Sequence, residues 1–254
     1  MGILIYLFNN LKSAVRQFDL LYEWLHFSSL YLLLLFILGN NFKFADVPIT
    51  DFPDNHHPVF LEIGYEQDCG PINLKPFWMN FEEFKYDIPY VIAEDVGPLT
   101  YKSVIYLPTV VLSESARLTY NLNASKADHI EMTETSYDIR KGGEPDGLKF
   151  HAEFQADGDW ETGNGPRFAV FEDIVSQTWF GRLEEHVKSC GNNKYDLGEV
   201  RYRSVVGTID ADEGIVSPMF PSDTVKVASL NQVSYGAAEV YVNFTITSAF
   251  DCLP

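Results

Sequence analysis

The sequence predicts a mainly β protein: an antiparallel β-barrel-like or sandwich domain with one flanking helix, preceded by an N-terminal hydrophobic helix. Three observations support this fold class. Short β-type runs are separated by clusters of Gly, Pro and Asn. Two of these runs alternate strictly between apolar and polar residues. One segment near the N-terminus is almost continuously apolar.

The apolar segment covers residues 20–39 and is uninterrupted from Leu30 to Leu38. Its length approaches the roughly 20 residues that an α-helix needs to span the hydrocarbon of a membrane. Lys12 and Arg16 precede the segment, whereas acidic residues soon follow it. The positive-inside rule therefore places the N-terminus in the cytoplasm and the rest of the chain outside.

Three interpretations of residues 1–42 stay open at this point. They are an uncleaved signal-anchor, a secretory signal peptide cut near Gly39, and a buried amphipathic helix. The first two imply an extracytoplasmic protein that is membrane-anchored or secreted. All three set this segment apart from a Pro- and Asp-rich linker over residues 43–58 and from a β-rich domain over residues 59–254.

The domain contains nine runs that we expect to be strands. Residues 148–155 place Phe150 and Phe154 on one face and charged or polar residues on the other, which is typical of a half-buried antiparallel strand. Residues 239–247 alternate in the same way and place Asn243 on the polar face. The predicted strands cover residues 59–65, 86–93, 101–112, 116–122, 148–155, 167–171, 199–209, 225–230 and 238–247.

One helix is expected among the strands, over residues 174–188. Apolar residues recur there at helical spacing from Val175 to Val187, Asp173 is suited to cap the start, and Gly191 lies just beyond the end. We expect this helix to pack on a twisted sheet that is closed or nearly closed.

Charge and composition limit the partners. The chain of 254 residues has a net charge of -18, so its field repels phosphate backbones and we exclude nucleic acid as a partner. The same charge fits either a solvated surface or an acidic surface that docks another protein. Aromatic residues make up 15% of the chain, which provides for a large apolar core.

The three cysteines are Cys69, Cys190 and Cys252, and none forms a C-x-x-C motif. A disulfide between Cys190 and Cys252 would tie down the C-terminus of an extracytoplasmic domain. Three buried thiols are the alternative.

Most catalytic and metal-binding motifs are absent from the sequence. It has no G-x-S-x-G, G-x-G-x-x-G, Walker or H-E-x-x-H motif. The run from Asp157 to Asn164 offers oxygen ligands at alternate positions, as calcium requires, but it lacks the distant bidentate glutamate, and an acidic hairpin turn is the alternative. We therefore expect no metal and no cofactor.

A succession of segments in residues 95–132 carries a resemblance to a known family. Val96-Gly97-Pro98 leads into an apolar strand, a turn of small residues follows, and then comes Asn121-Leu122-Asn123-Ala124-Ser125-Lys126. This order resembles the acetoacetate decarboxylase-like family, whose members carry a Gly-Pro-Tyr-x-Glu strand, a small-residue turn and a Pro-Lys segment.

The resemblance implies a lyase in which Lys126 forms a Schiff base with a small keto acid. A lysine desolvated in a barrel has a lowered pKa, and its iminium accepts the electrons released by decarboxylation. Arg117 lies near the position of the family's Gly-Arg-Glu turn. The chain departs from the family at Ser125, where members have proline, and at Ala127, where they have a second lysine.

Two functions therefore remain. The first is an acetoacetate decarboxylase-like barrel that binds or decarboxylates a keto acid at Lys126. The second is a membrane-tethered or secreted β module that contacts another protein without catalysis. Asn123 and Asn243 begin glycosylation sequons, and Asn243 is the one that we expect to be modified, because the alternation of its strand points it to solvent. A glycan on Asn123 and a buried Lys126 exclude each other.

Overall fold

The structure of the chain is a computed structural model. It describes residues 2–7, 42–49, 52, 57–70, 78–93, 103–113, 129–140, 147–163, 168–184, 187–211, 224–246 and 250–251. The elements within them are β1 (Gly2–Leu7), β2 (Phe42–Phe44), β3 (Val59–Cys69), β4 (Met79–Ala93), β5 (Val104–Leu112), β6 (His129–Met132), β7 (Ser136–Arg140), β8 (Leu148–Ala156), β9 (Glu161–Thr162), α4 (Ala169–Val175), β10 (Thr178–Glu184), β11 (Val187–Gly191), β12 (Asn193–Tyr195), β13 (Arg201–Ala211), β14 (Val225–Val227), β15 (Ala238–Tyr241), β16 (Phe244–Ile246) and β17 (Phe250–Asp251).

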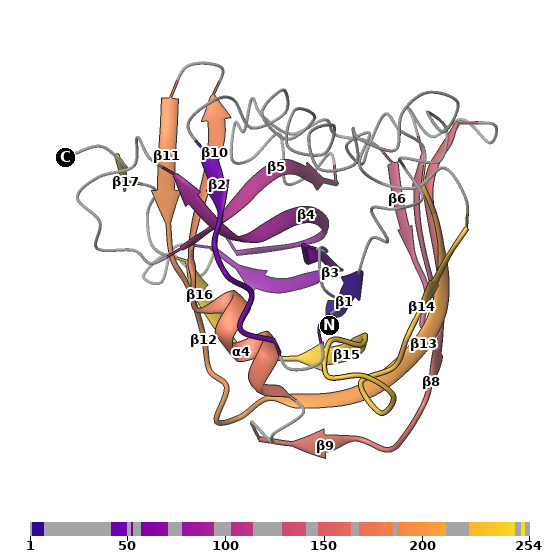
Figure 1. Ribbon diagram of the computed structural model, residues 1–254. Coiled ribbons are helices and arrows are strands. Elements are labelled where there is room, and N and C mark those ends of the chain that lie inside the picture. The colour runs from indigo at the N-terminus through magenta and orange to yellow at the C-terminus, as the bar shows by residue number, and fades with distance from the viewer. Residues whose placement is uncertain are drawn as a thin grey trace, which may run out of the picture.

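The described strands form one large curled sheet and a small second sheet of β12 and β16. The main path runs β17-β11-β10-β5-β4-β3-β1-β15-β13-β8-β7-β6, with β14 and β9 on β13 and β2 on β4. Among the described pairs of strands, β5 and β10 are parallel and the others antiparallel. Figure 1 shows the sheet curling from β10 and β11 through β4, β3 and β13 to β8 and β6, like a half-barrel. The predicted mainly β fold is thus confirmed.

The two central strands, β3 and β4, are covered on both faces. One face carries Leu61, Ile63 and Phe84, which pack toward β7 and β8; the Phe84 and Phe150 rings meet edge to face at 4.9 Å. The other face carries Phe60, whose ring lies 6.1 Å from that of Phe171 on α4. Polar side chains on this second face are therefore shielded from solvent by α4 and its neighbours.

The helix predicted over residues 174–188 is wrong. The chain is helical at Ala169–Val175, and residues 178–184 and 187–191 form β10 and β11. Trp179 packs with the core cluster on one face of the sheet while the next residue, Phe180, is buried in the other. A strand that is covered on both faces carries apolar residues on both sides. Some of these residues are then three or four positions apart, which is also the spacing along one face of a helix.

Two further strand predictions need correction. The described part of the run predicted over residues 167–171 is not a strand, because Phe168 and Phe171, three residues apart, are both buried where α4 packs on the sheet. The run over residues 238–247 is broken at Val242 and Asn243: β15 pairs with β13, whereas β16 leaves to pair with β12.

The sheet also takes in strands N-terminal to Val59. β1 pairs with both β3 and β15, and β2 pairs with β4. The predicted leader and linker therefore both contribute strands. The predicted hydrophobic helix lies outside the described residues, as does the predicted strand over residues 116–122. Across the part of the chain that the structure describes, no helix has the length and apolar character needed to cross a membrane.

Candidate functional site: a buried acid–lysine cluster

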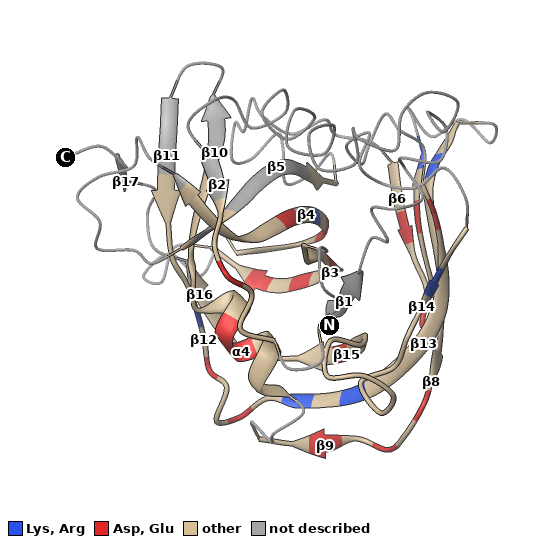
Figure 2. Ribbon diagram, in the orientation of Figure 1, with Lys and Arg blue, Asp and Glu red and all other residues tan. Residues whose placement is uncertain are grey.

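The second face of β3 and β4 carries a group of ionisable side chains that we call the acid–lysine cluster: Glu62, Glu66, Glu83, Lys85 and Asp87. The register of the two strands brings them together. Glu62 lies opposite Lys85, and Gly64, which has no side chain, lies opposite Glu83. Residues two apart in a strand share a face, so Glu83, Lys85 and Asp87 point the same way. Figure 2 shows acidic residues on both strands in the middle of the sheet.

Lys85 lies at the centre of the cluster. Its Nζ is 2.7 Å from Oε2 of Glu83 and 3.3 Å from Oε1 of Glu62. Tyr195, from β12, donates a hydrogen bond of 3.4 Å to the same Glu62 oxygen. Glu62, Glu66 and Glu83 each contribute one carboxyl oxygen, and these three oxygens lie within 4.8 Å of one another. The cluster thus gathers carboxyl groups from two strands around one ammonium.

These charged groups are buried. The side chains of Lys85, Glu62 and Glu83 are exposed by only 10%, 13% and 12%. Asp87 is 5% exposed, and its Oδ1 has no hydrogen-bond partner within the described residues. Burying unpaired carboxylates costs several kcal/mol each, so such a group persists only where something compensates its charge.

Burial shifts the pKa values of the cluster. Burial and the neighbouring Glu83 raise the pKa of Glu66 to about 8. Burial likewise raises the pKa of Asp87. Burial alone would lower the pKa of Lys85, but the carboxyl groups of Glu62 and Glu83 raise it well above its usual value. Lys85 is therefore an ammonium and not a nucleophilic amine.

Aromatic rings cover the cluster. The ring of Tyr195 lies 6.0 Å from Phe171 of α4 and 5.7 Å from Phe244 of β16. On the same face, the Tyr90 hydroxyl donates a 2.7 Å hydrogen bond to Asp173 of α4. α4 and the small sheet thus hold this side of β3 and β4 away from water.

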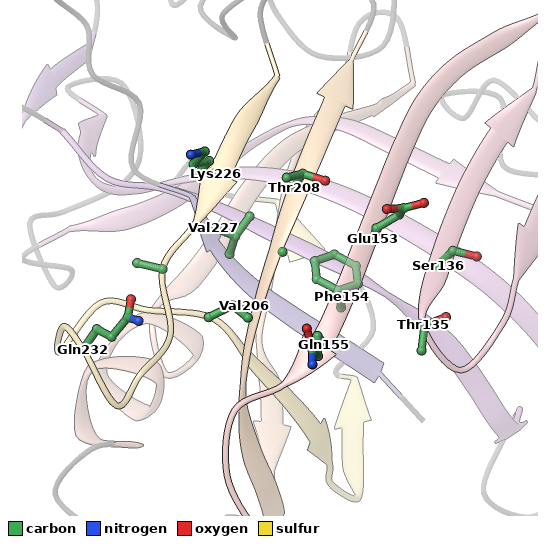
Figure 3. Close-up of a pocket in the computed structure, with 12 residues that line it drawn as sticks. Thr135, Ser136, Glu153, Phe154, Gln155, Val206, Thr208, Lys226, Val227 and Gln232 are labelled. Atoms are coloured by element: carbon green, nitrogen blue, oxygen red, sulfur yellow. The ribbon is translucent and has the colours of Figure 1, made fainter.

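A separate hollow of about 820 Å³ lies on β7, β8, β13 and β14. Figure 3 shows Lys226, Thr208, Glu153 and Ser136 in a row across it, as their cross-strand pairing requires. Glu153 and Lys226 are exposed to solvent. This hollow offers hydrogen bonds and weak ion pairs, whereas the acid–lysine cluster offers desolvated acid–base groups.

Comparisons with known proteins bear on the fold. No family model matches the sequence, and no curated protein matches it either. A solved structure does match: an acetoacetate decarboxylase-like enzyme from Sphingomonas wittichii RW1, with a TM-score of 0.51 and 12% sequence identity. The match covers 98% of this chain and 88% of that one. The chain has the fold of an acetoacetate decarboxylase-like enzyme. At this identity the likeness concerns the fold alone.

Of the site residues that the sequence predicted, the structure describes some and not others on this acetoacetate decarboxylase-like fold. Lys126 and Arg117 lie outside the described residues. Cys190 is disulfide-bonded. Because its strand β11 pairs with β17, with Cys190 opposite Phe250, a bond to Cys252 stays a prediction consistent with this register. Asn243 is exposed, as expected from its place on the polar face, and its glycosylation stays a prediction.

Sequence reasoning missed the acid–lysine cluster. Its signal is the alternation of Glu83, Lys85 and Asp87 with Phe84 and Tyr86. Such alternation usually marks a solvent-facing side, and the covering by α4 and β12 depends on residues much farther along the chain. The hydrogen bond between Tyr195 and Glu62 spans 133 positions.

Proposed function

We propose that this protein is an enzyme of the acetoacetate decarboxylase-like type that acts on a small keto acid through Lys126. The observation that carries the proposal is the acid–lysine cluster: a fold similar to such an enzyme buries five ionisable groups at its centre. Desolvated clusters with perturbed pKa values are concentrated at functional sites, whereas a module that only presents a surface has no need of one.

The cluster also bears on which lysine reacts. A Schiff base requires a neutral amine. Lys85 is held as an ammonium by Glu62 and Glu83, so it is unsuited to that role. Lys126, at the position that matches the family's reactive lysine, is the nucleophile in this proposal.

The Lys126 amine adds to the ketone carbon of a β-keto acid and water leaves, forming an iminium. The iminium nitrogen accepts the electron pair of the breaking carbon–carbon bond as carbon dioxide departs. The resulting enamine takes a proton at carbon, and water then releases the ketone and restores the amine. Buried carboxyl groups are suited to supply and recover these protons.

Reductive trapping tests the proposal. The full-length chain is treated with acetoacetate and borohydride near neutral pH, and the adduct is located by mass spectrometry. We expect modification of Lys126 above all other lysines, and its loss in Lys126→Ala but not in the matched variant Lys194→Ala, which removes an exposed lysine.

Two results would contradict the proposal. One is Lys126 reacting no faster than Lys194, and the other is a glycan on Asn123, which would place that segment at the surface. Either result would favour the other function, a β module that binds a protein partner.

A further inference from the structure

We infer that the acid–lysine cluster binds one divalent cation that prefers hard oxygen ligands, through Glu62, Glu66 and Glu83. Such a site goes beyond the proposed reaction, since it needs neither Lys126 nor a keto acid. The inference rests on the geometry of the carboxyl groups and on the buried Asp87, whose Oδ1 has no hydrogen-bond partner among the described residues.

The carboxyl geometry suits an ion such as Ca²⁺ or Mn²⁺. One oxygen from each of Glu62, Glu66 and Glu83 lies within 4.8 Å of the others. Ca²⁺–oxygen distances are about 2.3–2.6 Å, so ligands on opposite sides of one ion are separated by roughly 5 Å or less. Within the described residues, no other group of three His, Cys, Asp or Glu side chains meets this condition.

Asp87 supplies independent support. It is 5% exposed and its Oδ1 has no hydrogen-bond partner among the described residues. It shares a face of β4 with Glu83 and Lys85, and the charges of Glu62, Lys85 and Glu83 all act on it. The unpartnered carboxyl group is therefore aimed into the cluster. An added cation would compensate it, directly or through a bound water.

The charge balance favours the same conclusion. Once the binding of a cation has driven off their protons, the carboxyl groups of Glu62, Glu66, Glu83 and Asp87 carry four negative charges, against one positive charge on Lys85. A divalent ion reduces the resulting excess of three negative charges to one. This excess is what allows a metal ion and the Lys85 ammonium to share the cluster.

Lys85 leaves ligand atoms for the ion. Its ion pairs are formed with Oε1 of Glu62 and Oε2 of Glu83, so we assign the second oxygen of each carboxyl group to the ion. Tyr195 holds Oε1 of Glu62 and thereby orients the group. Hydrogen bonds of this kind fix the ligands of metal sites.

The other acidic segment of the sequence has a different character. In the segment that runs from the end of β8 into β9, Asp159 and Glu161 are exposed and Asp157 is half-buried. Water already solvates exposed carboxylates, so they gain little from a cation. This segment provides a control for non-specific attraction of cations to a protein of net charge -18.

The experiment titrates the full-length chain with Mn²⁺ and follows the electron paramagnetic resonance signal of the free ion. We expect one site per chain, from which Ca²⁺ or Mg²⁺ displaces Mn²⁺. Glu66→Gln should weaken binding at least about tenfold, as the loss of a ligand does, whereas Asp159→Asn should leave it unchanged.

A third variant tests the direction in which the Mn²⁺ affinity changes. Lys85→Met removes the ammonium that repels the ion, so Mn²⁺ should bind more tightly and raise the melting temperature of this variant more than that of the wild type. Absence of a stoichiometric site in the wild-type chain overturns the inference, whatever the variants do. So does weak binding at many sites, or binding that Asp159→Asn weakens as much as Glu66→Gln. Trapping at Lys126 is unaffected by any of these results, so the two proposals fail separately.

Discussion

The buried histidine His57 allows a sharp test of the packing around β2. Its ring stacks on Phe44 of β2 with 3.8 Å between centroids, and its Nε2 lies 2.6 Å from the carbonyl oxygen of Pro89 in β4. The side chain is 7% exposed. Burial lowers its pKa from 6.5 to about 4, although the hydrogen bond to Pro89 opposes this shift. The ring is therefore neutral at pH 7, and Nε2–H donates to the carbonyl.

The lowered pKa fixes the sign of the pH dependence. The unfolded chain takes up a proton on His57 near pH 6.5, whereas the folded chain takes it up only near pH 4. The contribution of the neutral His57 to the free energy of unfolding is therefore fully present above pH 6.5 and is lost as the pH falls from 6.5 to about 4. Each pKa unit corresponds to about 1.4 kcal/mol, so the loss by pH 4 is about 3 kcal/mol.

His57→Phe isolates this contribution. Phenylalanine keeps the stacking on Phe44 but loses the hydrogen bond, so the variant should be about 1–2 kcal/mol less stable than the wild type at neutral pH. Near pH 4 the order should reverse, because the variant has no imidazole to protonate. Urea unfolding of both proteins across this range measures the difference. A difference in unfolding free energy that stays the same from neutral pH to pH 4 would refute the reasoning.

Three other perturbations follow from the fold. Lys85→Met leaves the carboxyl groups of Glu62 and Glu83 buried without their ammonium, so without added metal the free energy of unfolding should fall by about 3–5 kcal/mol in urea titrations. Gly207→Ala would push a methyl group into the backbone of Glu153 and the ring of Phe154, so its melting temperature should fall, whereas Gly198→Ala, which meets only Asp196 at 3.6 Å, should be neutral. Deletion of residues 2–7 removes the strand between β3 and β15, so we expect loss of cooperative unfolding by circular dichroism; retained cooperativity would contradict the pairing of β1.

The strands with one solvated face were predictable from sequence. Residues 148–155 were expected as a strand, and β8 covers Leu148–Ala156 with Phe150 and Phe154 buried as the alternation requires. Here the side-chain period reports directly on the environment of each face. The prediction failed at Trp179 and Phe180, where both faces are covered and local sequence does not distinguish a buried strand from a helix.

The site was less predictable for a related reason. Glu62 and Lys85 are brought together by strand register, and Tyr195 reaches them only after the chain has passed through α4 and β10 to β12. Each residue alone resembles an ordinary surface charge. Their burial is a property of what covers the strands, which is decided by contacts far apart in the sequence.

The pairing of β1 constrains any association with a membrane. β1 and β2 belong to one sheet, so both lie on the same side of any bilayer as β3 and β4. A single crossing between them would separate strands that share this sheet, and cleavage near Gly39 would remove β1 altogether. An extracytoplasmic location, membrane-anchored or secreted, stays a prediction, and both routes to it that we expected for residues 1–42, the signal-anchor and the signal peptide cut near Gly39, conflict with the pairing of β1. A tag placed before Gly2 should therefore be accessible to protease on the same side of a membrane as one placed after Pro254. Tags accessible from opposite sides would show that β1 does not pair as the sheet requires.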